Sequence, residues 1–452
     1  MSIPSDPLPR FEIIENLEGD EDGLVLITVK CVFAPQETRI IYVAFKTNHG
    51  IPDAAENKVS MWDLDDTMDR AAYREAMGEL AQVHIFPLLE AVPHETLLWP
   101  AGGIATFAFS TTVDGSVQLA PGMLQSMKDV EARWLRSLPL IDTVSDYTPV
   151  VAVYDIDDVV VVDLVEGGSR DTMLAILRGQ PSSRYVTSRV PAATGCVWSD
   201  YDHHAKAVFH EMAFLRTIPP HPHIMGPPVG YISCVHEGRK VLCGYLIKYY
   251  PGGSLGERER ISAPIATRIK WAYQIVSGLR HLHHVAHTYH GDIKLDNVVL
   301  DENGDAILID LEQGRMNEEN AAPELRAASL VSVGDDSMLC YSTPRPGTDG
   351  AHARGGEDEG EVDLRLICKD RPYDIWKDTP RAIEAAEVWS FASALHPLLS
   401  DVATASAILA RCMSENPNCR PRFGELEEFF LELYQRQHDS GAVPVMLVDR
   451  RI

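Results

Sequence analysis

The chain has 452 residues, too many for one hydrophobic core, so two or three domains are expected. Its composition, 45% hydrophobic and 23% charged, is that of a globular protein. With 66 acidic and 40 basic residues the net charge is −26, and such a surface repels phosphate backbones and anionic lipid. We therefore expect neither a nucleic-acid partner nor a membrane partner.

The cysteines and the N-terminus indicate a reducing compartment. The eight cysteines form no Cys-x-x-Cys pair, which argues against a zinc ribbon and against a disulfide scaffold. The opening residues, MSIPSDPLPRF, lack the basic-then-apolar pattern of a secretory signal. Apolar runs such as VVVVDLV are far too short to span a membrane. The expected location is cytoplasmic, with a nucleocytoplasmic one as the alternative.

The first predicted domain, residues 1–141, is a small α+β module of unknown function. Residues 23–45 predict two strands around a turn, and residues 104–119 predict a hairpin around Asp114-Gly115. Residues 61–92 predict a helix, with Leu80, Val83 and Leu88 among its apolar positions. The module contains no catalytic constellation that the sequence reveals.

A second domain is predicted over residues 142–436, followed by a tail at 437–452. Its first part, 142–252, is strand-rich with one helix at 202–216. Its second part, 253–436, is mainly helical. The stretch at 334–362 is rich in Gly, Pro and Glu, a composition that favours a mobile acidic loop.

The most informative stretch is YHGDIKLDNVVLDENGDAILIDLEQG, from Tyr289 to Gly314. A hairpin is predicted there, with Asn303-Gly304 at its turn and Asp310 just past its second strand. The preceding residues predict an amphipathic helix, because apolar positions recur at spacings of three and four. These positions are Ile265, Ile269, Ala272, Ile275, Leu279 and Leu282.

Phosphoryl transfer gives each polar residue of this stretch a role. The attacking hydroxyl needs a carboxylate to position it and accept its proton, and Asp292 fits that role. Lys294 is placed to neutralise the γ-phosphate as charge develops. Mg²⁺ prefers hard oxygen ligands, which Asn297 and Asp310 supply from different elements. The predicted cofactors are therefore ATP and Mg²⁺.

This stretch resembles the protein kinase signature H-R-D-L-x-x-x-N followed by D-F-G. Ala322-Pro323-Glu324 matches the A-P-E that closes the activation segment, and EVWSFA at 387–392 is similar to the helix that reads D-V-W-S. In NPNCRPRF at 416–423 the resemblance implies that Arg420 pairs with Glu324.

The resemblance continues upstream. FHEMAFLRTIPPHPHIMGPP is similar to helix C and the segment after it, with Glu211 as the helix C Glu. GYLIKYYPGGSL at 244–255 is similar to strand 5 and the hinge, which places Ile247 near the gatekeeper position and Lys248 and Tyr249 beside the nucleotide. The implied fold is α+β and bilobal, with a small β-rich N-lobe at 142–252 and a helical C-lobe at 253–436. The phrasing is most similar to divergent kinase-like proteins of filamentous fungi.

Several positions depart from the family pattern. The place of the Gly-rich loop holds only Gly167 and Gly168, and the place of the strand 3 Lys holds Ser188, or Arg189 if the register slips by one. Glu211 then lacks its lysine partner, and the planar fork of an Arg is not a point-charge ammonium. Glu312 replaces the Gly of D-F-G, where it either adds a metal ligand or weakens the in-line geometry.

Three functional interpretations remain open. The first is a protein kinase of Ser/Thr type, as Lys294 implies, acting on an unknown protein. The second is a pseudokinase that serves as a binding or scaffold domain, given Ser188 and the reduced Gly loop. The third is a small-molecule kinase of the aminoglycoside or choline type, which also carries H-G-D, a following Asn and I-D-x-E. Lys294, Ala322-Pro323-Glu324 and Arg420 favour the protein-kinase lineage. The sequence does not specify the substrate or the oligomeric state.

Overall fold

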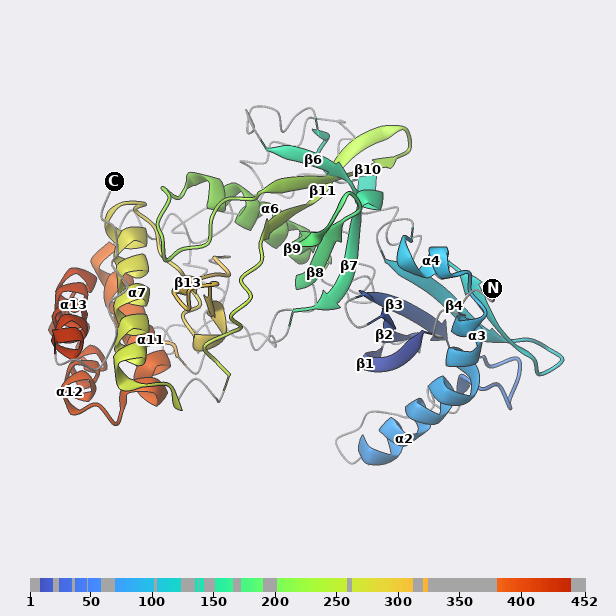
Figure 1. The fold of residues 1–452 in the computed structure, drawn as a ribbon, viewed down its shortest axis with the longest axis horizontal. Helices are drawn as coiled ribbons and strands as arrows, with labels where there is room; N and C mark the ends of the chain where they lie inside the picture. The colour runs from blue at the N-terminus through green and yellow to red at the C-terminus, as the bar shows by residue number, and fades with distance from the viewer. Residues whose placement is uncertain are drawn as a thin grey trace, which may run out of the picture. The chain divides into compact units, whose positions relative to one another are not determined.

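The computed structural model describes residues 9–18, 24–34, 37–46, 48–57, 70–100, 104–122, 135–136, 138–141, 151–165, 172–189, 201–257, 262–311, 320–323 and 380–439. The chain divides into two compact units (Figure 1). The sheet unit comprises Met1–Val208 and Pro228–Tyr249, and the helical unit comprises Phe209–Pro227 and Tyr250–Ile452. The predicted loop at 334–362 lies outside the described residues.

The N-terminal part of the sheet unit is a five-stranded sheet in the order β1-β2-β3-β4-β5. The strands are β1 (Arg10–Glu18), β2 (Leu24–Ala34), β3 (Glu37–Lys46), β4 (Ala105–Thr111) and β5 (Val117–Pro121). Strands β3 and β4 are parallel, so the chain between them makes a crossover, which carries helices. The hairpin predicted around Asp114-Gly115 is confirmed, and Gly115 adopts a φ of 81° at its turn.

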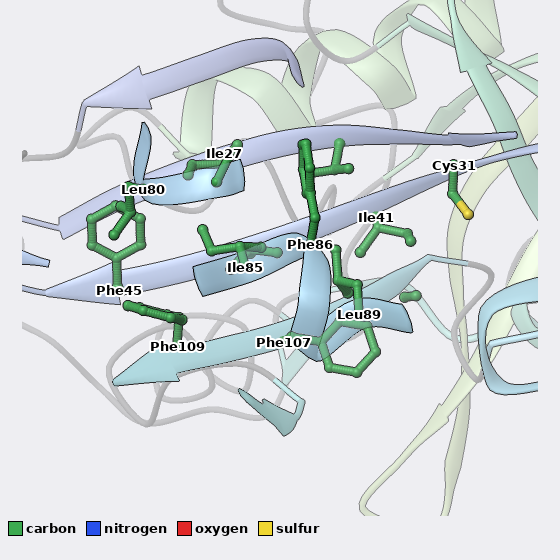
Figure 2. Packing of buried hydrophobic residues seen from close by; sticks show 14 of the residues in the cluster. Ile27, Cys31, Ile41, Phe45, Leu80, Ile85, Phe86, Leu89, Phe107 and Phe109 are labelled. Carbon is green, nitrogen blue, oxygen red and sulfur yellow. The ribbon is translucent and has the colours of Figure 1, made fainter. Parts of the chain in front are cut away.

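The crossover helices cover one face of this sheet. They are α2 (Arg70–Leu80), the π-helical turn η1 (Ala81–Ile85), α3 (Phe86–Glu90) and α4 (His94–Leu98). Figure 2 shows Leu80, Ile85 and Phe86 packed over the strands. The expectation that Val83 belongs to the apolar face is wrong, since its side chain is 56% exposed. The wider π turn changes the angular spacing of its residues and carries position 83 away from the sheet.

The second part of the sheet unit is a six-stranded sheet in the order β6-β10-β11-β9-β8-β7. Its strands are β6 (Ala152–Asp155), β7 (Val159–Leu164), β8 (Thr172–Leu177), β9 (Gln180–Arg189), β10 (Gly230–His236) and β11 (Arg239–Lys248). The 3-10 turn η4 (Ile156–Asp158) joins β6 to β7. Helix α6 (Tyr201–Thr217) stands between β9 and β10, where the sequence predicts it.

The helical unit is built around α7 (Ile265–His284). Its other described helices are α11 (Pro380–Leu399), α12 (Ala403–Cys412) and α13 (Phe423–Asp439), with 3-10 turns η7 (Leu295–Asn297) and η8 (Pro417–Cys419). The predicted apolar face of α7 is buried, except that Ile265, its first residue, is 43% exposed. Within the described residues, no helix combines the length and the apolar character that crossing a membrane requires.

Candidate phosphate-transfer site

The site is built on the predicted hairpin, which consists of β12 (Val298–Leu300) and β13 (Ala306–Leu308). At its turn the Asp301 carboxylate accepts hydrogen bonds from the amides of Asn303 and Asp305, both at 2.8 Å, and Gly304 has a φ of 72°. Gln274 of α7 binds the hairpin twice, by accepting from the Ala306 amide at 2.9 Å and donating to Asp305 at 2.6 Å. The hairpin is thereby fixed to the long helix.

Two further segments extend the hairpin on both sides. The Leu308 amide donates to the His223 carbonyl at 3.0 Å, and the Met225 amide donates to the Leu308 carbonyl at 2.9 Å. On the other side the amides of Gly252 and Leu300 donate to the carbonyls of Leu300 and Gly253, each at 2.9 Å. A side chain at position 252 would place its Cβ 2.5 Å from the Leu300 Cβ, so this approach requires glycine.

The loop between α7 and the hairpin brings three of the predicted site residues together. The Asp292 Oδ2 accepts from the Lys294 Nζ at 2.5 Å and from the Asn297 Nδ2 at 3.0 Å. The same Asn297 nitrogen also donates to the Asp292 carbonyl at 2.9 Å. The amide nitrogen of Asn297 therefore orients the carboxylate, while its amide oxygen takes no part in these bonds.

The charge on Lys294 is stabilised by its acidic neighbours. Burial by itself lowers the pKa of Lys294, but the hydrogen bond to Asp292 and the charges of Asp292, Asp310 and Asp296 outweigh burial and raise it. Lys294 is therefore protonated throughout the neutral range. The charge of Asp310 thus acts on Lys294 together with those of Asp292 and Asp296.

Asp310 itself is held in an uncommon backbone conformation. Its φ is 61°, in the left-handed region that only a small fraction of non-glycine residues adopt. The preceding amide, that of Ile309, donates to the Asn297 carbonyl at 3.0 Å and so ties the end of β13 to the loop. Strained residues of this kind are concentrated at functional sites, which supports the prediction that Asp310 acts in the site.

The oxygen donors fit a Mg²⁺ ion that arrives with a nucleotide. Asn297 and Asp310 offer one amide oxygen and one carboxylate, and Mg²⁺ in nucleotide sites is typically held by one or two such groups together with phosphate oxygens. No group of three or more His, Cys, Asp or Glu residues able to hold a metal occurs in the described ranges. Glu312, the third predicted ligand, lies outside those ranges.

A buried glutamate of α11 supports the loop from behind. Glu387 accepts hydrogen bonds from the Gly291 amide at 2.6 Å and the His290 amide at 3.0 Å, and its Oε2 lies 2.6 Å from the His283 Nε2. Burial by itself raises the pKa of Glu387, but the hydrogen bonds from His283 and from the Gly291 amide outweigh burial and lower it. Glu387 is therefore an ionised acid inside the core.

Sequence reasoning did not assign this role to Glu387. The signal was present in the EVWSFA motif, where an acid stands among apolar helix residues. A charged group that is fully buried needs partners, which is the physical clue. In the same region His290 is buried, which lowers its pKa, and its Nδ1 accepts from the Asp292 amide at 3.3 Å. A neutral imidazole thus supports the backbone beside Asp292.

The other predicted nucleotide-binding residues lie on several elements or outside the described residues. Ser188 is half-buried in β9, opposite Tyr245 and Thr172. Lys248 is exposed at the end of β11, and Tyr249 packs against an apolar cluster of the sheet unit. Gly167, Gly168 and the side chain of Arg189 lie outside the described residues, and the helix C Glu, Glu211, is buried on α6. Their nucleotide-binding roles stay predictions.

Arg420 is buried and makes contacts beyond the predicted one. Its Nε donates to the Ser414 carbonyl at 2.8 Å, and its guanidinium lies 5.0 Å from the centre of the Trp389 ring. Glu324, its predicted partner, lies outside the described residues, so that pairing stays a prediction.

The site has the arrangement that kinases use for phosphoryl transfer. An Asp, a Lys and an Asn lie on a loop between a long helix and a hairpin, and a further Asp follows the hairpin.

Residues 196–329 match the family model of the protein kinase domain. The "Salt tolerance receptor-like cytoplasmic kinase 1" of Oryza sativa subsp. japonica is 38% identical over 101 residues. Those residues make up 20% of this chain and 26% of the rice protein. The chain therefore contains a protein-kinase-like domain of α+β fold, as the motifs predict. The resemblance to fungal sequences stays a prediction.

Proposed function

We propose that the chain is a phosphotransferase of the protein kinase type, which uses ATP and Mg²⁺ to phosphorylate a Ser/Thr-type hydroxyl of a protein. The observation that carries the proposal is the pair of hydrogen bonds to Asp292, whose Oδ2 accepts from both Lys294 and Asn297. Two donors on one carboxylate oxygen fix the direction of Asp292, as a base that must meet an acceptor hydroxyl requires. The match to the protein kinase domain supports this proposal over a small-molecule kinase.

Each residue then has a chemical task. Asp292 orients the acceptor hydroxyl and takes its proton, while the protonated Lys294 lies beside it to neutralise the transferred phosphoryl group. Asn297 and Asp310 would hold Mg²⁺, which supplies positive charge to the phosphates when bound. Asp292 keeps its direction because Glu387 and His290 fix the backbone on its N-terminal side.

The second candidate function is a pseudokinase that binds or scaffolds a partner. Ser188 favours it, since β9 presents a half-buried hydroxyl where the family has its strand 3 Lys. An anchor for the α- and β-phosphates is thereby lost. Both candidates share the fold, so a measurement of phosphate transfer distinguishes them.

We also propose a cytoplasmic location and a protein partner or substrate, without nucleic-acid or membrane partners. The net charge of −26 supports the exclusion of anionic polymers and anionic lipid. The name of the rice relative describes a cytoplasmic kinase, which is consistent with this location.

The first test is thermal unfolding of the full chain with ATP, Mg²⁺, both or neither. A ligand at 100 times its dissociation constant stabilises the folded state by about 2.7 kcal/mol, which raises the Tm by several degrees. We expect this rise only with ATP and Mg²⁺ together, because Asn297 and Asp310 alone offer too few oxygens for Mg²⁺. An unchanged Tm at millimolar nucleotide would favour the pseudokinase that serves as a scaffold.

The substitution Asp310→Asn tests the metal role. Asparagine tolerates the left-handed region at least as well as aspartate, so the backbone at φ 61° is kept while the charge is lost. We expect Mg²⁺-dependent ATP affinity to fall by about 100-fold, the size of the larger losses caused by changes around metal sites. Isothermal titration measures it, and an unchanged affinity would remove Asp310 from the metal site.

A further inference from the structure

The five-stranded sheet has a second apolar face, opposite the one that its helices cover. Leu26, Ile40 and Tyr42 of this face pack against Val161 of β7 and Met173 of β8, and all five side chains are almost fully buried. Strand β3 lies against strand β7 within the sheet unit (Figure 1). The N-terminal module and the six-stranded sheet thus share one apolar layer.

Polar contacts fix the alignment of this layer. The Lys30 Nζ lies 2.5 Å from the Asp163 Oδ2, and the Tyr42 hydroxyl donates to the Met173 sulfur at 3.7 Å. Asp163 and Met173 lie at the adjoining ends of β7 and β8, where Leu164 pairs with Met173. The module therefore contacts both strands close to the point where β7 ends and β8 begins.

Trp99 of the N-terminal module contacts the other face of β7 and β8. The guanidinium groups of Arg39 and Arg178 each lie over its ring, at 5.0 and 5.4 Å from the ring centre. It also packs, together with Tyr249, against a second apolar cluster of the sheet unit, made of Val160, Val162, Leu174 and Ile176. Since side chains alternate along a strand, these residues and those under the five-stranded sheet lie on opposite faces of β7 and β8.

The pairing register of β8 and β9 shows which face of the six-stranded sheet is not covered by the five-stranded sheet. Ser188 of β9 pairs with Thr172 and Val186 pairs with Leu174, so Ser188 belongs to the face of the Trp99 and Tyr249 cluster. Met173, under the five-stranded sheet, pairs with Thr187 instead. The five-stranded sheet therefore covers the reverse of the face on which the strand 3 Lys would stand.

We propose that the N-terminal module is a positioning domain that restrains β7 and β8 from both faces and thereby sets the nucleotide affinity of the kinase-like domain. Strand β7 is the last strand of its sheet and pairs with β8 alone in that sheet, so external packing has most to add there. The effect on affinity rests on the proposed function, whereas the restraint of the strands does not.

A charge-reversal cycle on the full chain tests both parts. Lys30→Glu and Asp163→Lys each place like charges together, and the double variant restores an ion pair of opposite polarity. The two side chains are 26% and 33% exposed, so reversal is compatible with folding. We expect each single variant to speed amide hydrogen exchange in β7 and β8 and to weaken Mg²⁺-dependent binding of a fluorescent ATP analogue by about fivefold, a modest coupling between sites. The double variant should recover most of both losses.

The matched control is Arg280→Glu, which reverses one charge of the Arg280–Glu427 pair between α7 and α13 in the helical unit. It should leave amide hydrogen exchange in β7 and β8 and binding of the ATP analogue at wild-type values.

The outcomes decide the two parts of the proposal separately. Unchanged hydrogen exchange in the Lys30 and Asp163 variants, or no recovery in the double variant, would overturn the restraint of the strands. Faster exchange with unchanged affinity would overturn the positioning role. A wild-type chain that binds no analogue would refute the proposed function and the effect on affinity, while the exchange data would still decide the restraint.

Discussion

Replacing Glu387 with alanine is expected to lower the free energy of unfolding by about 3 to 5 kcal/mol, because three buried donors lose their acceptor at about 1 to 3 kcal/mol each. The reason is the set of groups that the carboxylate satisfies. His283 would lose its partner at 2.6 Å, and the amides of His290 and Gly291 would lose their acceptor in a region without solvent. Chemical denaturation of the full chain measures the change.

Two variants make the Glu387 measurement specific. Glu387→Gln keeps an oxygen for the Gly291 amide but loses the charge, so its loss should be intermediate. Glu432→Ala removes an ion pair on α13 whose side chains are 70% and 66% exposed, and it should change stability by less than about 0.5 kcal/mol. A loss below about 1 kcal/mol for Glu387→Ala would show that the buried acid does not support the loop.

The pH dependence of the Glu387 effect has a defined sign. Its pKa in the folded protein is lowered from the ordinary value of 4.5, so the ionised acid contributes its stability above that value. The contribution is lost as the pH falls below 4.5 through the folded pKa. The difference in unfolding free energy between wild type and Glu387→Gln should therefore be constant near neutral pH and shrink in acid.

The residues whose proximity the sequence predicts are those whose contacts are local. Asp292, Lys294 and Asn297 lie on one loop, and the hairpin after it brings Asp310 back to that loop. The spacing of the motif is sufficient for such a site, because a helix, a loop and a hairpin leave few alternative geometries. Predicting these residues required no knowledge of the remaining fold.

Contacts between distant segments escaped the prediction. Glu387 reaches Gly291 across 96 residues and Lys30 reaches Asp163 across 133, and no periodicity encodes which distant partner a charge finds. Val83 was misplaced for a different reason, since a helical period of 3.6 cannot anticipate a π turn. Burial of a charge or a change of helical pitch depends on tertiary packing, which pattern reasoning does not include.

Asp292→Asn is expected to lower kcat by about 100- to 10,000-fold while ATP binding stays within about twofold of wild type, because positioned proton acceptors contribute rate enhancements of that size. The new amide still offers an oxygen to Lys294 and Asn297, so the loop keeps its conformation. What is lost is the ability to take the proton of the acceptor hydroxyl. Single-turnover kinetics measure the rate of phosphate transfer, and a separate titration measures the affinity for ATP.

The control for Asp292→Asn is Asp296→Asn, which removes an exposed carboxylate from the same loop and should retain most of the turnover. Equal losses in both variants would mean that loop charge, rather than a base at Asp292, sets the rate. Full turnover in Asp292→Asn would refute the base assignment. If the wild-type chain binds Mg²⁺ and ATP but transfers no phosphate to a protein acceptor, the pseudokinase function is favoured. The half-buried Ser188 would then mark the loss of the strand 3 Lys in a nucleotide-binding domain. The ordered Asp292, Lys294 and Asn297 would then serve to hold a nucleotide rather than to consume it.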